Sequence, residues 1–530
     1  MMAQSVYEQF AQTAHKNSAR PFLNITEATA AAYGIDAGEI TYGEILTAVD
    51  ARAGEFQKAG YGKGHRVGLL LENRPSYFVN WFALNSLGVS VVPINPDLRS
   101  AELEYLIGHS DQCLAIAIEP RIRELQEAVN GLKVIAPEEE APPAPSEPGP
   151  DDFQEAALLY TSGTTGMPKG CMLSNSYFLK CGDGYSTVGG HCTLHRDGER
   201  MLTPLPLFHM NAMACSVMGM IAVGGCLTVL DRFHPSTWWQ DVASSKASII
   251  HYLGVMPAIL MQLETLPAER GHNVRFGFGA GVDRALHAPF EERFGFPLIE
   301  AWAMTETGNG AVIAASSEPR YVGTNCIGKP SADVEIKIVD ERGKPASLGT
   351  PGELLVRRSG ANPRYGFFDG YLKDEEATEE AWRGGWFHTG DVVRKNQDGT
   401  LVFVDRKKNV IRRSGENISA VEVETVLMQH PDVAAAAVAA VADELRGDEV
   451  FACIVPAEEV ETGKLADGLF RWCRERLAYY KAPGFFAFVE ELPLTSTNKI
   501  NRGALKSLVT ELNNEGAAID LRQFKKRVVA

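Results

Sequence analysis

Short apolar runs alternate with helix-like segments over the first 136 residues. Pro75 opens one such segment and Gly88 follows its end, and these two residues are typical of a helix start and a helix stop. Strands that are separated by helices predict a parallel sheet with helices on both faces. The apolar runs that we expect to be strands lie at 67–71, 89–94, 113–118 and 132–136.

The pattern changes twice further along the chain. Residues 137–151 (PEEEAPPAPSEPGPD) are rich in proline and acid, which indicates a solvated linker or a long surface loop. A second strand–helix series follows from 154 to 315. Beyond it, residues 333–339, 352–358 and 400–404 alternate or are continuously apolar, with glycine-rich turns between them. These runs predict an antiparallel β unit.

The segment from 408 onward has a pattern of its own. Strand-like runs lie at 433–441 and 450–455, and an amphipathic helix runs from Leu465 to Leu477. We therefore expect an α/β protein with two domains. Residues 1–407 would form a large N-terminal domain of two doubly wound αβ subdomains plus a β-rich subdomain, and 408–530 a small, mobile α+β C-terminal domain.

Composition excludes several classes of protein. Of 530 residues, 45% are hydrophobic and 22% charged, as in an ordinary globular protein rather than a disordered chain, a collagen or a coiled coil. With 51 basic and 67 acidic residues the net charge is −16, which disfavours nucleic acid as a partner because its backbone would be repelled. No run approaches the roughly 18 apolar residues of a membrane span, so we expect no integral membrane segment.

The chain start and the cysteines indicate a cytoplasmic protein. The first residues, MMAQS, lack the basic and apolar regions of a signal peptide. The nine cysteines are odd in number and no pair has CxxC spacing, which favours reduced thiols without a structural zinc site.

The densest chemical signal is YTSGTTGMPKG at 160–170. Small residues let backbone N–H groups approach an oxyanion, hydroxyls add donors and lysine adds charge, so the segment is suited to a polyphosphate. The spacing differs from a Walker loop, and a flexible surface linker is the alternative. The candidate phosphate-binding residues are Thr161, Ser162, Gly163, Thr164, Thr165, Gly166 and Lys169.

This segment resembles the phosphate loop of the adenylate-forming superfamily, which comprises acyl-CoA synthetases, peptide-synthetase adenylation domains and luciferases. Further segments resemble other motifs of that superfamily and occur in the same order along the chain. Five such matches in the same order make the resemblance specific. The segment FVDRKKNVIRRSGENISAVEVE looks most like bacterial crotonobetaine/carnitine–CoA ligases and fatty acyl-CoA ligases. The further segments are PLFH at 206–209, AWAMTET at 301–307, GWFHTGD at 385–391, DRKK at 405–408 and PLTSTNKI at 493–500.

The resemblance implies an ATP-dependent acyl-CoA ligase, an AMP-forming acid–thiol ligase. A carboxylate would attack the α-phosphate of ATP to give acyl-AMP and pyrophosphate, and CoA would then displace AMP. The first step brings two anions together and therefore needs Mg²⁺ and cationic donors. The alternative is a stand-alone adenylation enzyme that passes the acyl group to a carrier-protein thiol. An NTPase that releases ADP and a non-catalytic binder are more distant alternatives.

The catalytic residues implied by the resemblance are Thr305, Glu306, Lys499 and His209. Glu306 would bind Mg²⁺ and Thr305 would contact the α-phosphate. Lys499 would reach the carboxylate during adenylation, although Asn498 stands where the family has glycine. His209 would border the carboxylate channel, or pack in the core.

Further residues would bind the nucleotide. Asp391 would accept from both ribose hydroxyls, or act as a turn residue. Arg406 would contact the ribose or a phosphate, or form a surface ion pair. Trp302 stands where the family usually has tyrosine, and would stack on adenine or pack in the core. The segment that would border adenine and the acyl group is Gly279, Ala280 and Gly281.

The second half-reaction implies a hinge and a thiol channel. Lys408 matches the hinge position, and the loop with Ser414 and Gly415 would border the CoA arm. We expect an aliphatic or otherwise mostly apolar acid, with the methionines from 210 to 220 either lining its pocket or packing in a helix core. The resemblance leaves a homodimer open.

Overall fold

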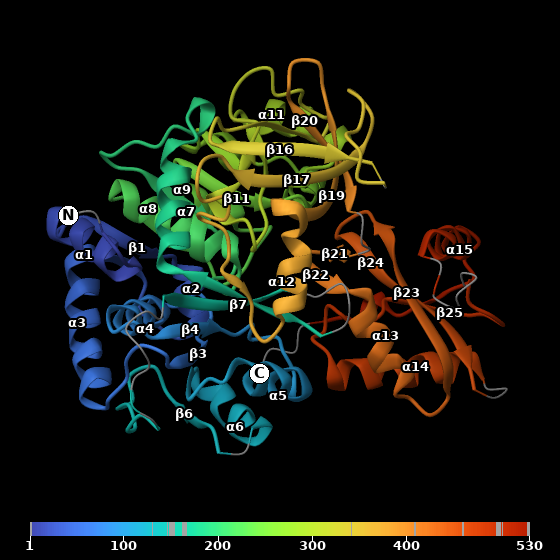
Figure 1. Cartoon of the computed structure of the whole chain (residues 1–530), viewed down its shortest axis with the longest axis horizontal. Coiled ribbons are helices and arrows are strands. Elements are labelled where there is room, and N and C mark those ends of the chain that lie inside the picture. The colour runs from blue at the N-terminus through green and yellow to red at the C-terminus, as the bar shows by residue number, and fades with distance from the viewer. Residues whose placement is uncertain are drawn as a thin grey trace.

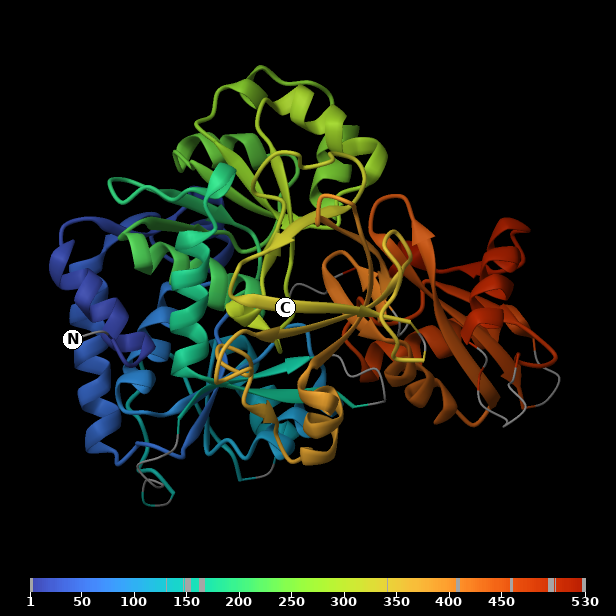
Figure 2. The same ribbon diagram turned by 45° about the horizontal axis from the view of Figure 1, so that its top comes forward.

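A computed structural model of the chain describes residues 3–129, 131–145, 147, 154–161, 167–340, 342–406, 410–457, 461–493, 500 and 502–526. Figure 1 and Figure 2 both show a large N-terminal body, blue to yellow, with a smaller C-terminal domain, orange to red, at its side. In the described part of the chain, no helix combines the length and apolar character that crossing a membrane requires.

The first strand–helix series forms the expected sheet, with β4, β3, β5 and β6 parallel to one another. Strands β7 and β18 extend it, and β8 runs antiparallel between them. Its elements are β3 (Arg66–Leu70), α4 (Pro75–Ser86), β4 (Ser90–Pro93), α5 (Ser100–Ser110), β5 (Leu114–Ala117), α6 (Glu119–Ala128), β6 (Lys133–Ile135), β7 (Glu155–Thr161), β8 (Lys169–Ser174), α7 (Asn175–Thr187) and β18 (Gly370–Tyr371).

Both faces of this sheet are buried, which confirms the expected layers. Leu69 packs in one core together with Phe78 of α4, whereas the next residue, Leu70, packs in another with Leu106 of α5. Successive side chains on a strand point to opposite faces, so a strand covered on both sides is apolar throughout. This explains why the runs at 67–71 and 89–94 do not alternate.

The second series forms a larger, mostly parallel half-sheet, with two differences from the expectation: β7 and β8 join the first sheet, and β1 and β2 from the chain start join this one, β2 antiparallel at its edge. Strands β1, β10, β9, β11, β12 and β13 lie side by side in that order and parallel. The elements of this half are α1 (Val6–Lys16), β1 (Pro21–Ile25), α2 (Glu27–Tyr33), β2 (Gly38–Thr41), α3 (Tyr42–Lys58), β9 (Arg200–Thr203), α8 (Val217–Val223), β10 (Cys226–Val229), α9 (Trp238–Ser244), β11 (Ile249–Leu253), α10 (Val255–Gln262), β12 (Phe276–Ala280), α11 (Arg284–Phe294) and β13 (Leu298–Trp302).

The antiparallel β unit predicted beyond residue 315 is confirmed. Strand β16 pairs antiparallel with β17, β17 with β19, and β19 with β20. This half continues the parallel one through β14 and β15. Its elements are β14 (Ile313–Ala314), β15 (Cys326–Pro330), β16 (Val334–Val339), β17 (Gly352–Arg358), α12 (Glu375–Ala381), β19 (Phe387–Lys395) and β20 (Leu401–Arg406).

The C-terminal residues build hydrophobic cores that include no described residue before Ile411. They form a separate sheet in which β23 and β24 are antiparallel. This α+β arrangement is the expected one. The elements are β21 (Val410–Arg413), β22 (Glu416–Ser419), α13 (Ala420–Met428), β23 (Val433–Asp443), β24 (Gly447–Pro456), α14 (Thr462–Arg476), β25 (Phe485–Phe488), α15 (Arg502–Asn514) and β26 (Ile519–Asp520).

A buried lysine joins the two parts of the molecule. Lys481 Nζ lies 2.6 Å from Glu102 Oε1 of α5 and 2.8 Å from Glu422 Oε1 of α13. Burial alone would lower the pKa of Lys481, but the two carboxylates raise it. Beside this contact, Asn95 Nδ2 donates to Tyr480 Oη at 3.0 Å. The C-terminal domain is therefore docked through a charged contact that is shielded from water.

The ion pair at the start of β7 should contribute strongly to stability. Arg66 Nε lies 2.7 Å from Glu155 Oε1, and the Ser90 hydroxyl donates to the same oxygen at 2.7 Å. Glu155→Ala would remove the nearer carboxylate partner of Arg66 and leave only the more distant Asp111 Oδ2 at 4.0 Å, where 12% of the Arg66 side chain is exposed. We expect a loss of about 3–5 kcal/mol in the free energy of unfolding, measured by chemical denaturation.

A matched control is Glu127→Ala in the pair of Arg123 and Glu127, whose side chains are 89% and 64% exposed. An exposed pair is worth about 0–1 kcal/mol, so this variant should unfold almost as the parent does. Equal losses in the two variants would contradict the structural role given to Glu155.

Candidate active site

A cavity with a volume of about 1230 Å³ lies where several parallel strands end. Leu253 at the end of β11, Ala280 at the end of β12 and Ala301 near the end of β13 form one wall. The short helix α12 and strand β19 form the opposite side, and the β21–β22 hairpin adds residues from the C-terminal domain. A crevice at the carboxyl ends of parallel strands is the usual place for a ligand in such sheets.

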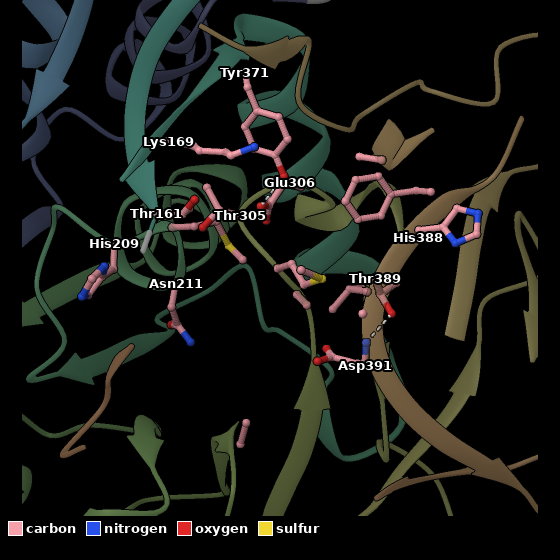
Figure 3. Close-up of a pocket in the computed structure, with 18 of the residues that line it drawn as sticks. Thr161, Lys169, His209, Asn211, Thr305, Glu306, Tyr371, His388, Thr389 and Asp391 are labelled. Carbon is pink, nitrogen blue, oxygen red and sulfur yellow. Dashed lines mark hydrogen bonds between the residues drawn. The ribbon is translucent and has the colours of Figure 1, made fainter. Parts of the chain in front are cut away.

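Most described residues that the sequence analysis singled out line this cavity. Figure 3 shows several of them, with Glu306 and Thr305 near the centre and Asp391 on the far side from Tyr371. Six segments distant in sequence are thus brought together. The predicted residues that line the cavity are Thr161, Lys169, His209, Gly279, Ala280, Thr305, Glu306, Asp391 and Gly415.

Other predictions are not decided by the structure. Gly281, Trp302 and Ser414 are not among the cavity-lining residues. The side chain of Arg406 lies outside the described residues. Several other predicted residues also lie outside the described residues: Ser162, Gly163, Thr164, Thr165 and Gly166, the expected hinge Lys408, and Lys499. The roles of these residues stay predictions.

Glu306 is held in place by a tyrosine that the sequence analysis did not identify. The Tyr371 hydroxyl donates to Glu306 Oε1 at 2.9 Å, and only 8% of Glu306 is exposed. Burial and then the negative charge of Glu306 raise the pKa of Tyr371, so its proton stays on the oxygen. Figure 3 shows this contact as a dashed line. Tyr371 comes from β18, a two-residue strand with no motif to mark it.

Lys169 lies beside this pair. Its Nζ is 4.9 Å from the centre of the Tyr371 ring and 3.0 Å from Asp374 Oδ2. With 24% of its side chain exposed, Lys169 keeps access to the cavity. One end of the cavity therefore combines a carboxylate, an ammonium group and the hydroxyl of Thr305, which is a donor set for a phosphate and its metal ion.

Asp391 is oriented from two sides. Trp302 Nε1 donates to Asp391 Oδ2 at 2.8 Å, and the backbone N–H of Asp391 donates to Thr389 Oγ1 at 3.0 Å. The indole of Trp302 is buried, with 5% exposed. It packs in the core and contacts the cavity-lining Asp391, and stacking on adenine stays a prediction. The family usually has tyrosine at this position, so an indole N–H group stands here in place of a phenol hydroxyl.

The Gly279–Gly281 segment shows why glycine is needed beside this wall. A β-carbon on Gly279 would lie 2.1 Å from the carbonyl oxygen of Tyr252, and Gly281 has a φ of +80°. The carboxylate of Glu300 fixes the turn, accepting from the Gly281 and Val282 N–H groups at 2.9 and 3.0 Å. Burial raises the pKa of Glu300. The strand thus approaches the cavity with its backbone rather than with side chains.

His209 lies at the boundary between the two domains. Its Nε2 is 3.2 Å from Glu416 Oε2 of β22, and 39% of its side chain is exposed. Core packing therefore does not describe this residue. It borders both the main cavity and a smaller one of about 350 Å³ between the domains. The position suits the gating role that the sequence predicted, and that role stays a prediction.

The β21–β22 hairpin reaches the cavity with its tip. Arg413 pairs with Glu416, so Ser414 and Gly415 form a two-residue turn, and their φ values of +50° and +91° are both left-handed. A β-carbon on Gly415 would lie 2.3 Å from Leu253 Cδ1 of β11. Only glycine allows the tip to approach this closely.

The methionines divide between the two expected roles. Met210 lines the cavity, whereas Met213, Met218 and Met220 are buried in the core and are not among its lining residues. Cys215, Leu253 and Phe278 complete an apolar wall near Met210. One polar side chain interrupts this wall, that of Asn211 in the π-helical turn η2 (Asn211–Ser216), which the sequence analysis also missed.

Comparison with known sequences places the chain in a family. The AMP-binding enzyme family matches residues 11–372, and the AMP-binding enzyme C-terminal domain matches residues 422–499. The crotonobetaine/carnitine–CoA ligase of Shigella flexneri is 29% identical over 492 residues, which are 88% of this chain and 93% of that protein.

Solved structures are similar over nearly the whole chain. The o-succinylbenzoate–CoA synthetase of Bacillus subtilis, as a double mutant bound to a product analogue, superposes with a TM-score of 0.81, 26% identity and coverage of 94% of this chain and 98% of that one. The same enzyme in complex with AMP gives a TM-score of 0.64 with the same identity and the same coverage of each chain. The match to more than half of the sequence, together with the shared architecture, shows that this chain belongs to the family of AMP-binding enzymes.

Proposed function

We propose that this chain is an ATP-dependent acyl-CoA ligase, which activates a carboxylic acid as acyl-AMP with release of pyrophosphate and then transfers the acyl group to CoA. One observation carries the proposal. A single cavity joins Lys169, Thr305 and Glu306 to Asp391, and it is closed by a hairpin from a separately folded domain. The relatives named above are CoA ligases and a CoA synthetase, which supports CoA as the acceptor.

The residues fit ATP with Mg²⁺. Among the described residues, no group of three or more His, Cys, Asp or Glu side chains could hold a metal ion. Mg²⁺ needs no such group, because it is usually bound through one or two carboxylates together with substrate phosphates and water. Glu306 supplies one carboxylate, fixed by Tyr371, and the bound ion would neutralise phosphate charge. Asp391 presents a carboxylate suited to two ribose hydroxyls.

The chain's own residues would reduce the repulsion between the substrate carboxylate and the phosphates. Thr305 presents a hydroxyl to the α-phosphate, and Lys169 supplies positive charge on the same side of the cavity. The apolar wall of Met210, Leu253 and Phe278 excludes water from the acyl end, which strengthens these electrostatic interactions. Lys499 completes this set in the proposal, delivered by the C-terminal domain.

The docked C-terminal domain suits the thiol step rather than adenylation. Of its described residues, Arg412 and Gly415 line the cavity, and α15 lies at the outer edge of the molecule in both Figure 1 and Figure 2. The higher TM-score with the product-analogue complex than with the AMP complex supports the same assignment. We therefore take residues 1–407 and 408–530 as the moving units, with Lys408 as hinge.

A cytoplasmic location and a homodimer complete the proposal. The location is supported by the nine cysteines without CxxC spacing. The homodimer stays a prediction from the family resemblance.

The reaction products test the function directly. A panel of carboxylic acids should release AMP and pyrophosphate from ATP, with thioester only when CoA is added. Glu306→Gln keeps the shape of the side chain but removes its charge. Pyrophosphate release should therefore fall about 100-fold or more, whereas the exposed control Glu292→Gln should match the parent. Release of ADP across the panel would overturn the assignment.

Gly415→Ala should separate the two half-reactions. The added β-carbon would meet Leu253. The backbone at residue 415 is also left-handed, and this conformation costs a residue other than glycine about 1–3 kcal/mol. Docking of the hairpin tip weakens, so thioester formation from pre-made acyl-adenylate should slow by about tenfold or more. Adenylate formation should be nearly unchanged. The control is Gly463→Ala, where a β-carbon meets nothing within 4 Å.

Lys499→Ala should have the opposite effect. A single well-placed charge at a developing anion is worth about 2.7–4 kcal/mol, so acyl-adenylate formation should fall roughly 100- to 1000-fold. Supplied with pre-made acyl-adenylate and CoA, the variant should form thioester at close to the parental rate. A similar collapse of both half-reactions in a folded variant would argue against two working orientations of the domain.

A further inference from the structure

A buried histidine lies directly behind the acyl end of the cavity. His251 of β11 is completely buried, and its ring packs beside Phe278, which lines the cavity. Tyr185 Oη lies 2.8 Å from His251 Nε2. On the other side of the ring, Asn211 Oδ1 and Ser216 Oγ each lie 2.9 Å from Nδ1. Burial lowers the pKa of His251 to about 3, so the ring is neutral at physiological pH.

The hydrogen-bond partners of His251 determine which of its ring nitrogens carries the proton. A neutral imidazole has one N–H group and one acceptor nitrogen. In the described part of the chain, His251 Nε2 is the acceptor within reach of the buried Tyr185 hydroxyl, and a buried donor without an acceptor is costly. The hydroxyl of Tyr185 therefore donates to Nε2, and the proton of His251 lies on Nδ1.

That proton fixes the orientation of the Asn211 amide. The Nδ1–H group must face an acceptor, and the Oδ1 atom of Asn211 meets it at 2.9 Å. Ser216 also fits, because its hydroxyl donates to the carbonyl oxygen of Asn211 and leaves a lone pair toward Nδ1. The reversed amide would set two donors against each other. The NH₂ group of Asn211 is therefore directed away from His251.

The NH₂ group then faces the cavity. Asn211 lines it and is partly exposed, and no described protein atom accepts a hydrogen bond from its Nδ2. The neighbouring wall is apolar, made of Met210, Cys215, Leu253 and Phe278. Figure 3 places Asn211 near His209 and apart from Tyr371 and Asp391, so it lies at the acyl side rather than beside the Glu306 pair.

We propose that Asn211 Nδ2 is a fixed hydrogen-bond donor for the acyl group, and that the natural substrate is a carboxylic acid bearing an acceptor oxygen, such as a ketone, on its chain. This inference rests on the proposed ligase function. It narrows the class of substrates expected from sequence, which was a mostly apolar acid. A single donor in an apolar wall favours an acid with a single acceptor in an otherwise apolar chain. A plain alkyl acid would leave the donor unpaired.

The test compares matched acids. Straight-chain alkanoic acids and the keto acids that carry one carbonyl at successive positions are assayed for pyrophosphate release. At the matching position, the keto acid should exceed its alkyl partner in kcat/KM by about tenfold or more. Asn211→Leu should abolish this ratio by lowering the kcat/KM of the keto acid to that of its alkyl partner.

Two further variants test the orientation of the amide. In Asn211→Asp, one carboxylate oxygen still accepts from the Nδ1–H group of His251, and the other presents an acceptor to the cavity. The keto acid should therefore lose its higher kcat/KM relative to the alkyl acid, whereas the matching hydroxy acid, which can donate, should keep a higher kcat/KM. Tyr185→Phe removes the hydroxyl that sets the proton on His251. It should lower the keto-to-alkyl ratio without changing the kcat/KM of the alkyl acid, and a thermal melt checks that it is folded.

Binding gives a readout that needs no turnover. The sulfamoyladenosine analogues of one keto and one alkyl acyl-adenylate are titrated calorimetrically into the parent and into Asn211→Leu. The keto analogue should bind the parent more tightly by the same factor, and the two should bind the variant alike. A parent ratio near one at every carbonyl position would overturn the inference. An equal loss of kcat/KM for the keto and the alkyl acid in Asn211→Leu would also overturn it, because Asn211 would then contact the adenylate moiety that all the intermediates share.

These failures differ from failure of the proposed function. If no acid yields AMP and pyrophosphate, the ligase assignment is wrong. The binding of the two analogues would then still decide whether Asn211 recognises an acceptor.

Discussion

The site must hold negative charges next to one another, and much of the structure serves that requirement. The proposed substrates are a carboxylate and a triphosphate, and Glu306 and Asp391 add two buried carboxylates of the protein itself. Each of these acids accepts a hydrogen bond from a neutral donor, Glu306 from Tyr371 and Asp391 from Trp302. A neutral donor orients a carboxylate without cancelling its charge, which suits a metal ion and ribose hydroxyls.

In the proposed function, the same requirement explains why a second domain would contribute charge and shape at different times. A cation fixed beside the phosphates would serve adenylate formation but would obstruct the approach of a thiol. A domain with its own core can present one face for each step without any change in its fold. The buried contact of Lys481 with Glu102 favours the docked orientation, since breaking it removes the lysine partner of Glu102, whereas Lys481 keeps Glu422 of its own domain.

The fold was predictable from sequence because run length and burial are linked. Strands covered on both faces are short and uniformly apolar, and the runs at 67–71 and 89–94 have this form. Asp391 and Glu306 were predictable because each belongs to a motif. Tyr371 was not, because its role arises only when β18 pairs with β8 and thereby approaches Glu306. The orientation of Asn211 depends on Tyr185 and His251, which local patterns cannot connect. Trp302 was placed in the right region, but its partner was not foreseen.

The π-helical turn η2 has an evolutionary consequence. In an α-helix with 3.6 residues per turn, positions five apart diverge by about 140°. The wider turn brings Asn211 and Ser216 to the same nitrogen of His251. A π turn corresponds to one residue inserted into a helix, so a single-codon deletion in η2 would rotate Asn211 relative to Ser216 and His251. Relatives of this chain can therefore change acyl preference by an insertion or deletion that a comparison of aligned residue types would overlook.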